Sequence, residues 1–98
     1  MKFEWDPDKN EANKVKHRVS FEIAETVFDD AKAIYLYDEI HSDGEDRFIV
    51  IGKADSLKRE LTVCHCYRGL NEDIIRIISA RDATKKELQI YISGGVGE

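Results

Sequence analysis

The sequence has few of the features that mark disordered, secreted or membrane-embedded proteins. Its 98 residues include one proline and two cysteines, and no apolar run approaches the length of about 20 residues that spans a bilayer. The stretch from Met1 to Asp6 lacks the basic and then apolar order of a signal peptide. With 42% hydrophobic and 36% charged residues, we expect one soluble, cytoplasmic domain over residues 1–98, ending in a flexible tail over residues 93–98.

The chain has no excess of positive charge, because 15 Lys and Arg are outnumbered by 20 Asp and Glu, which gives a net charge of −5. This argues against nucleic-acid binding by bulk electrostatics. The charge is unevenly placed, however: residues 38–46 contain five acids and no Lys or Arg, whereas residues 14–18 and 76–86 are rich in cations. We expect the acidic segment to be a solvated face.

The two cysteines lie close together, at Cys64 and Cys66 in a predicted strand. Their side chains share a face at a separation near the upper limit for a disulfide, so reduced thiols are expected. His65 projects to the opposite face, and no second ligand pair stands at the spacing of a zinc site. The sequence therefore implies no metal and no other cofactor, and we interpret the two thiols as small buried strand residues.

The first third of the chain predicts a short strand and two helices. Residues 2–6 form the strand, and Asp6 followed by Pro7 is the pattern of a helix N-terminus. Asn10, Asn13 and His17 fall on one stripe of this partly exposed helix. Ser20 is the expected cap of a second helix, which carries apolar residues at helical spacing through residue 28.

The remainder predicts a meander of strands and a last helix. Strands are expected over residues 33–37, 47–53, 60–67 and 73–79, joined by connections short enough for antiparallel neighbours. Thr84 and Glu87 match a capping box. Residues 88–92 fit a helix or a terminal strand. The predicted fold class is α+β, with two N-terminal helices and a C-terminal helix packed on a mostly antiparallel sheet of four to five strands.

Arg76 lies between isoleucines in the last predicted strand. Alternation places it on the face of Ile74 and Ile78, with Ile75, Ile77 and Ser79 on the other, so both faces are largely apolar. We expect a central strand covered on both sides. A guanidinium there needs a carboxylate, such as Glu22 or Asp29, or an anionic ligand.

Two long motifs and several short ones follow one another along the chain. The first motif comprises Phe3 to Pro7 with Lys9, Asn13, Lys16-His17, Val19 to Glu22, Ala24 and Val27 to Asp29. The later pieces are His41-Ser42, Arg47-Phe48, Ile51-Gly52, Arg68-Gly69 and Arg76 to Arg81 with Ala83-Thr84 and Glu87. In this order the pieces resemble the BrnT-like toxin family, and the likeness extends from Phe3 to Tyr91. The chain departs from the family at Arg18, where glycine is usual, at Cys66 and at Tyr67.

The resemblance implies a toxin of a type II toxin–antitoxin pair with a fold similar to RelE and ParE toxins. It further implies a metal-independent ribonuclease that binds RNA and inhibits translation. The implied partner is a ribbon-helix-helix antitoxin, which would form a hetero-oligomer with the toxin. The alternative is a non-catalytic protein-binding module that acts as partner subunit of a repressor complex.

Metal-free RNA cleavage needs a base, an acid and cations that hold the phosphate. We expect His17, Arg76 and Arg81 to be catalytic: His17 as base or acid, and the arginines as a phosphate clamp. Lys16, Lys85 and Lys86 are expected to bind flanking phosphates of the RNA.

Each of these residues also has a structural interpretation. His17 can stabilise a helix C-terminus, and Arg76 can form an internal ion pair. Glu87 can be a cap rather than a base, His65 a core histidine, and Tyr91 a packing residue. Lys85 and Lys86 can be the solvated start of a helix.

Overall fold

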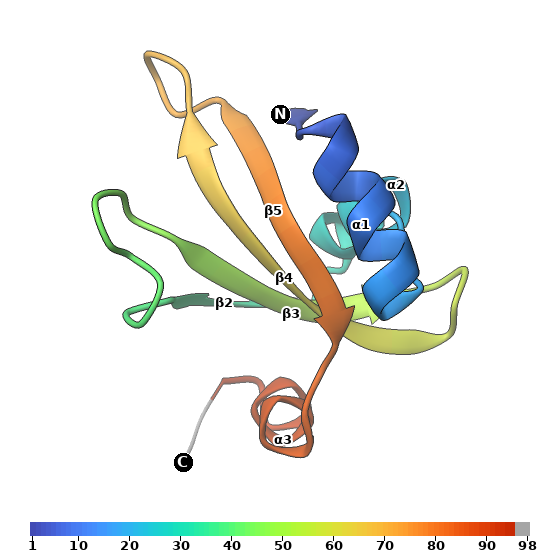
Figure 1. The fold of residues 1–98 in the computed structure, drawn as a ribbon. Helices are drawn as coiled ribbons and strands as arrows, with labels where there is room; N and C mark the ends of the chain where they lie inside the picture. The colour runs from blue at the N-terminus through green and yellow to red at the C-terminus, as the bar shows by residue number, and fades with distance from the viewer. Residues whose placement is uncertain (96–98) are drawn as a thin grey trace.

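A computed structural model of the chain describes residues 1–95. Within these residues, five strands form one sheet in the order β1-β5-β4-β3-β2 (Figure 1). Strands β2 to β5 form the predicted antiparallel meander, and β1 pairs in parallel with β5 at the sheet edge. The bounds are β1 (Lys2–Glu4), β2 (Ile34–Tyr37), β3 (Phe48–Ala54), β4 (Arg59–Arg68) and β5 (Ile74–Asp82). The predicted α+β class with a mostly antiparallel sheet is confirmed.

The helices begin where the capping patterns predict. Helix α1 follows Asp6 as its N-cap, α2 follows Ser20, and the capping box of Thr84 and Glu87 opens α3. The bounds are α1 (Pro7–His17), α2 (Phe21–Glu25), the 3-10 helix η1 (Thr26–Asp29) and α3 (Lys85–Ile92). Residues 88–92 are therefore helical. Of the predicted tail, residues 93–95 form a turn, and residues 96–98 lie outside the described residues.

The helices cover opposite faces of the sheet. Leu61 and Val63 of β4 belong to the core under α2, whereas Thr62 between them donates a hydrogen bond to Glu87 of α3, at 2.8 Å. Because neighbouring strand residues point to opposite faces, α2 and α3 lie on different sides. Figure 1 accordingly shows α1 and α2 together beside β5, with α3 away from them. We call the two sides the α1–α2 face and the α3 face.

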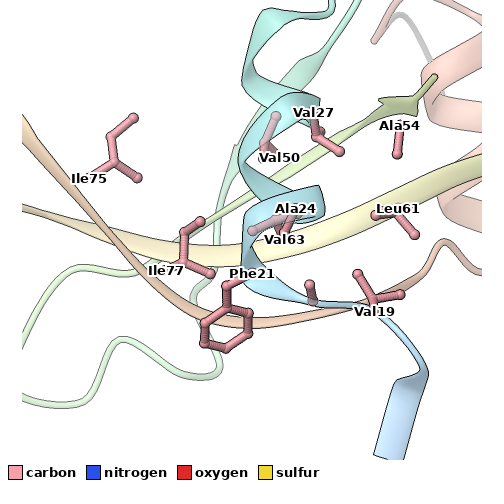
Figure 2. Packing of buried hydrophobic residues seen from close by; sticks show 11 residues of the cluster. Val19, Phe21, Ala24, Val27, Val50, Ala54, Leu61, Val63, Ile75 and Ile77 are labelled. Carbon is pink, nitrogen blue, oxygen red and sulfur yellow. The ribbon is translucent and has the colours of Figure 1, made fainter. Parts of the chain in front are cut away.

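The hydrophobic core fills the space between α2 and the sheet (Figure 2). Phe21, Ala24 and Val27 project from the helical layer onto Val50 and Ile77, and all five are 0 or 1% exposed. Gly52 of β3 permits this close approach, because a Cβ atom at this position would lie 2.8 Å from Val27 Cγ1. The core therefore fixes the side of the sheet on which α1 and α2 lie.

The polar stripe of α1 closes an open sheet edge. Strand β1 pairs only with residues 74–76 of β5, so the later part of β5 lacks a neighbouring strand on that side within the described chain. There Asn13 Nδ2 donates to the Ala80 carbonyl at 2.9 Å, and Asn13 Oδ1 accepts from the Ala80 N–H at 3.1 Å. Asn13 also donates to the carbonyl of Val19, and Asn10 accepts from the N–H of Phe21. Both asparagines are buried, and they pair groups that would otherwise be unsatisfied.

A β-bulge interrupts the alternation of β5. Cys64 of β4 pairs with Ser79 and His65 pairs with Ile77, so Ile78 is an extra residue on β5. Arg76 lies opposite Cys66, and Arg81 lies opposite Thr62. Because Thr62 and Cys66 share a face of β4, both arginines lie on the α3 face. Without the bulge, their spacing of five would have put them on opposite faces.

Two expectations about β5 are wrong. The strand is not covered on both sides along its length, because Arg76 is about one-third exposed, at 33%, and its neighbours Ile74 and Ile78 are only partly buried. Ser79 lies on the face of Arg76, opposite Cys64, and not on the face of Ile77. The bulge causes this second difference.

Candidate functional site

A hollow on the α3 face gathers charged and polar side chains from β3, β4, β5 and the loop after β2. The residues that matter for its chemistry are Asp38, His41, Arg47, Thr62, Cys64 and Arg81. Ile78 and Ser79, at the bulge of β5, form its rim. The hollow therefore combines two guanidinium groups, one imidazole and one carboxylate in a single concave surface.

Arg81 is held in this hollow by Glu87. Its Nη1 and Nη2 atoms donate to Glu87 Oε1 and Oε2 at 2.8 and 3.1 Å. Glu87 also accepts from the Thr62 hydroxyl and from the Thr84 N–H. Burial acts to raise the pKa of Glu87, but the hydrogen bonds from Arg81, the Thr84 N–H and Thr62 outweigh it and lower the pKa to about 2. Glu87 is thus an ionised cap and anchor, and the Arg81 side chain remains 40% exposed.

Arg76 lies on the same face as Arg81 but does not line the hollow. Its Nη1 donates to Glu4 Oε2 at 2.9 Å. The prediction that Arg76 pairs with Glu22 or Asp29 is wrong. Glu4 takes this role because the parallel pairing of β1 with β5 sets Glu4 opposite Arg76, and Glu22 instead accepts from Asn10 at 3.0 Å.

His17 and Lys16 line a second hollow, along the edge of β5 that α1 covers. Ile78 and Ser79 border both hollows, so the two lie on either side of this rim. The three residues predicted to act together are thus distributed: Arg81 in the first hollow, His17 in the second and Arg76 in neither. His17 is also the last residue of α1, a position at which a cation stabilises the helix dipole.

Lys85 and Lys86 are the first two residues of α3 and are exposed. They follow Thr84, which places them near Arg81 along the chain but outside the lining of the hollow.

Sequence reasoning missed the contribution of the acidic segment to the hollow. His41 Nδ1 lies 2.9 Å from Asp38 Oδ2, and both residues share the hollow with Arg81. We expected this segment to be a solvated face. One sequence signal pointed to this arrangement. His41 stands three residues after Asp38 and six before Arg47, and this mixture of imidazole, carboxylate and guanidinium is not typical of a loop whose acids are only solvated.

The Cys64-His65-Cys66 triplet is split between the two faces. Burial and the nearby Asp38 carboxylate raise the pKa of the Cys64 thiol to about 11, so it remains neutral in the hollow. His65 is 0% exposed and packs edge-on against Phe28 at 4.9 Å between ring centroids. Burial lowers the pKa of His65, as in a neutral core histidine. Among residues 1–95, no three His, Cys, Asp or Glu side chains converge as for a metal ion.

Tyr91 fastens α3 to the rest of the fold. Its hydroxyl donates to Asp30 Oδ2 at 2.6 Å, and this hydrogen bond, with burial, raises the pKa of Tyr91 to about 12. Tyr91 is not among the residues that line the hollow. This contact is a structural hydrogen bond, whereas the structural interpretation assumed apolar packing.

Comparisons with known proteins agree on one family. The family model described as the ribonuclease toxin BrnT of type II toxin–antitoxin systems matches residues 5–87. The crystal structure of the Brucella abortus ribonuclease toxin BrnT is similar, with a TM-score of 0.66 and 25% identity, over 87% of this chain and 99% of that chain. No curated protein sequence matches. In the described part of the chain, no helix is long and apolar enough to cross a membrane.

Proposed function

The chain belongs to the BrnT family of ribonuclease toxins of type II toxin–antitoxin systems, and we propose that it cleaves RNA at the hollow on the α3 face. In this proposal cleavage needs no metal ion and halts translation in the cytoplasm. The observation that carries it is the concentration of Arg47 and Arg81 beside an imidazole in one hollow of a protein whose net charge is −5.

Arg81 is the proposed phosphate-binding residue. A guanidinium has five N–H donors in a rigid fork, and the two hydrogen bonds to Glu87 leave others for a phosphate oxygen. The ion pair also fixes the direction of the fork, which lowers the entropy lost when RNA binds. Arg76 is proposed to contact the next phosphate along the same face, in competition with Glu4.

The RNA is proposed to cross the Ile78–Ser79 rim between the two hollows. Lys16 then binds a flanking phosphate on the edge of β5, and Lys85 and Lys86 bind one near the start of α3. His17 approaches from the far side of the rim and is proposed to protonate the leaving 5′-oxygen. Strand cleavage would proceed by attack of the neighbouring 2′-hydroxyl on phosphorus.

Membership of a type II toxin–antitoxin family implies an antitoxin partner. We propose that this partner is a ribbon-helix-helix protein and that the two form a hetero-oligomer. We also propose that the fold is related to RelE and ParE toxins, on the basis of the helical pair on one face and the C-terminal helix on the other.

The test is cleavage of RNA by the purified protein in the presence of EDTA. Arg81→Ala should lower the rate by about 10- to 100-fold, because a charge-assisted hydrogen bond contributes about 1.5 to 3 kcal/mol. Arg59→Ala is the matched control: Arg59 also pairs with a carboxylate, Asp82 at 2.6 Å, and is similarly exposed, but it lies outside the hollow. Equal rates for the two variants, or no cleavage by the unmutated protein, would contradict the proposal.

One observation favours the alternative of a non-catalytic protein-binding module in a repressor complex. Both Arg76 and Arg81 already have carboxylate partners, Glu4 and Glu87. Under this alternative, growth inhibition by the expressed protein would survive Arg81→Ala and His17→Ala, and antitoxin binding would remain intact.

A further inference from the structure

The Asp38–His41 pair has the geometry of a histidine fixed by a carboxylate. His41 Nδ1 lies 2.9 Å from Asp38 Oδ2, and the His41 backbone N–H donates to Asp38 Oδ1 at 3.4 Å. The Asp38 side chain is only 14% exposed, whereas that of His41 is 64% exposed. The carboxylate thus holds one ring nitrogen from the protein side, and a hydrogen bond at Nδ1 sets the tautomer that leaves Nε2 as an acceptor.

The loop that carries the pair is anchored at its base. The Asp38 N–H donates to the Arg47 carbonyl at 2.8 Å. The Ser42 hydroxyl donates to the Asp38 carbonyl at 2.6 Å and accepts from the Arg47 N–H at 2.9 Å. These hydrogen bonds tie both ends of the loop to one serine, so the imidazole stands on a fixed base although it lies outside the sheet.

The groups that share the hollow with His41 suit an anionic substrate. The titratable and charged side chains there are Asp38 on the same loop, Arg47 on the approach to β3, Cys64 on β4 and Arg81 on β5. Cys64 is neutral at physiological pH, since its pKa is about 11. The full charges that remain in the lining are one carboxylate, engaged by His41, and the guanidinium groups of Arg47 and Arg81. Each arginine also has a carboxylate partner outside the lining, Glu45 at 3.6 Å and Glu87 at 2.8 Å. Because a guanidinium has five N–H donors, a phosphate bound by those left over would lie beside the imidazole.

We propose that His41 is the general base of the reaction and that Asp38 is its positioning residue. This inference rests on the proposed ribonuclease function. His41 Nε2 takes the proton of the 2′-hydroxyl as O2′ forms a bond to phosphorus. The P–O5′ bond breaks, and the 5′-oxygen leaves with a proton from His17, which gives a 2′,3′-cyclic phosphate and a 5′-hydroxyl. His41 then releases the proton it took to solvent, and His17 takes up a proton from solvent.

His17 fits the base role less well. It ends α1 in the second hollow, and the hydrogen bonds of residues 1–95 give its ring no carboxylate partner. Of these two histidines, only His41 has a carboxylate within residues 1–95 that orients its ring, so the proposal assigns the base step to His41 and the acid step to His17.

The experiment measures single-turnover cleavage of two RNA substrates by the full chain. One substrate is ordinary RNA, and the other carries sulfur in place of the bridging 5′-oxygen at the cleaved bond. A thiolate leaves without protonation, so this substrate needs the base but not the acid. His41→Gln should lose about 100-fold in rate on both substrates. His17→Gln should lose rate on ordinary RNA and recover it on the sulfur substrate.

Ile40→Ala is the control for the loop, since Ile40 is adjacent to His41, 87% exposed and outside the hollow. It should cleave both substrates at the unmutated rate. Unfolding midpoints separate loss of chemistry from loss of folding, and those of His41→Gln and Ile40→Ala should agree with that of the unmutated protein because both side chains are exposed. Should His41→Gln unfold, rescue of His41→Ala by added imidazole provides the same readout.

The variant Asp38→Asn tests whether Asp38 orients the His41 ring or only holds the loop together. It should lower kcat with little change in KM, and it should have no further effect in a His41→Ala background, since the two residues act as a unit. An equal loss in both backgrounds would mean that Asp38 only supports the loop.

The outcomes separate the two proposals. If the unmutated protein cleaves RNA and His41→Gln cleaves it equally fast, His41 is not the base, and the ribonuclease function stands. Recovery of His41→Gln on the sulfur substrate would make His41 an acid and overturn the assignment. If the unmutated protein cleaves neither substrate, the ribonuclease function fails and this inference fails with it.

Discussion

Two residues at helix ends, Arg18 and Glu87, have a strained backbone conformation and a largely buried charge, respectively. Arg18 follows α1 with a φ of 60°, the left-handed region that favours glycine. Its N–H donates to the Lys14 carbonyl, which ends the helix. Glu87, in the first turn of α3, accepts hydrogen bonds from Arg81, Thr62 and Thr84. One residue therefore bears conformational strain, and the other organises the neighbouring charge.

Replacing Arg18 by glycine should stabilise the fold. A residue with a Cβ costs about 1 to 2 kcal/mol in the left-handed region, and glycine's greater freedom in the unfolded chain offsets part of this. We expect Arg18→Gly to raise the free energy of unfolding by about 0.5 to 1 kcal/mol in urea titrations. Arg18→Ala removes the same charge but keeps the strain, so it should show no gain. Equal gains in the two variants would point to charge instead.

Glu87→Gln should destabilise the protein in a pH-dependent way. The pKa of Glu87 is lowered from 4.5 to about 2 in the fold, so its contribution to stability is complete above pH 4.5 and is lost as the pH falls toward 2. Gln keeps the shape but not the charge. At pH 7 the variant should lose about 1 to 2 kcal/mol, since its partner Arg81 is partly exposed.

The measurement is the free energy of unfolding of both proteins from pH 2 to pH 7. The difference between them should shrink below pH 4.5. Glu39→Gln, in the exposed loop, controls for the change in net charge. A constant difference across this pH range would show that the Glu87 carboxylate is not preferentially ionised in the fold.

At the scale of elements, local sequence signals predicted which helices and strands exist and in which order they follow. They did not predict how the strands pair. Asp6, Ser20 and Thr84 identified the helix starts because a cap is a short-range hydrogen bond between neighbours in sequence. The meander followed from short connections. The parallel pairing of β1 and the bulge at Ile78 depend on contacts between residues far apart in the sequence, so no local pattern predicts them. The partner of Arg76 was missed because it depends on that pairing.

The candidate site divides in the same way. Arg81 and His17 were predicted as site residues because their residue types suit phosphate chemistry, and the fold places them in different hollows. The grouping of Asp38 and His41 with Arg81 was not predicted, because the loop that brings them together is a tertiary feature. The bulge also changes which arginines share a face. Sequence alone therefore identified candidate groups, and the fold decided which of them meet.

Asn13→Ala should test the helix that closes the edge of β5. Asn13 pairs with both polar groups of the Ala80 peptide and is 6% exposed. Its removal leaves buried donors and acceptors without partners, at about 1 to 3 kcal/mol for each. We expect a loss of about 2 to 4 kcal/mol in urea unfolding. Lys14→Ala, on an exposed turn of the same helix, should cost less than about 0.5 kcal/mol, and similar losses in both would contradict this role of Asn13.

At the scale of the whole molecule, the two faces of the sheet have separate tasks. The α1–α2 face holds the apolar core, and the α3 face carries Arg76, Arg81 and the hollow. The net charge of −5 is thus no obstacle to a local cationic surface, because potentials at close range depend on nearby groups and distant charges are screened by salt.

The closed edge of β5 has a consequence for how the protein behaves at high concentration. A strand with unpaired peptide groups is a template on which another copy can add, and repeated addition leads to fibrils. Because a side chain of α1 already occupies the Ala80 peptide, this position cannot serve as such a template. Detachment of α1 would therefore uncover the peptide groups of β5 and allow self-assembly before the core becomes solvent-exposed. Aggregation should be the first consequence of weakening the contact between α1 and β5.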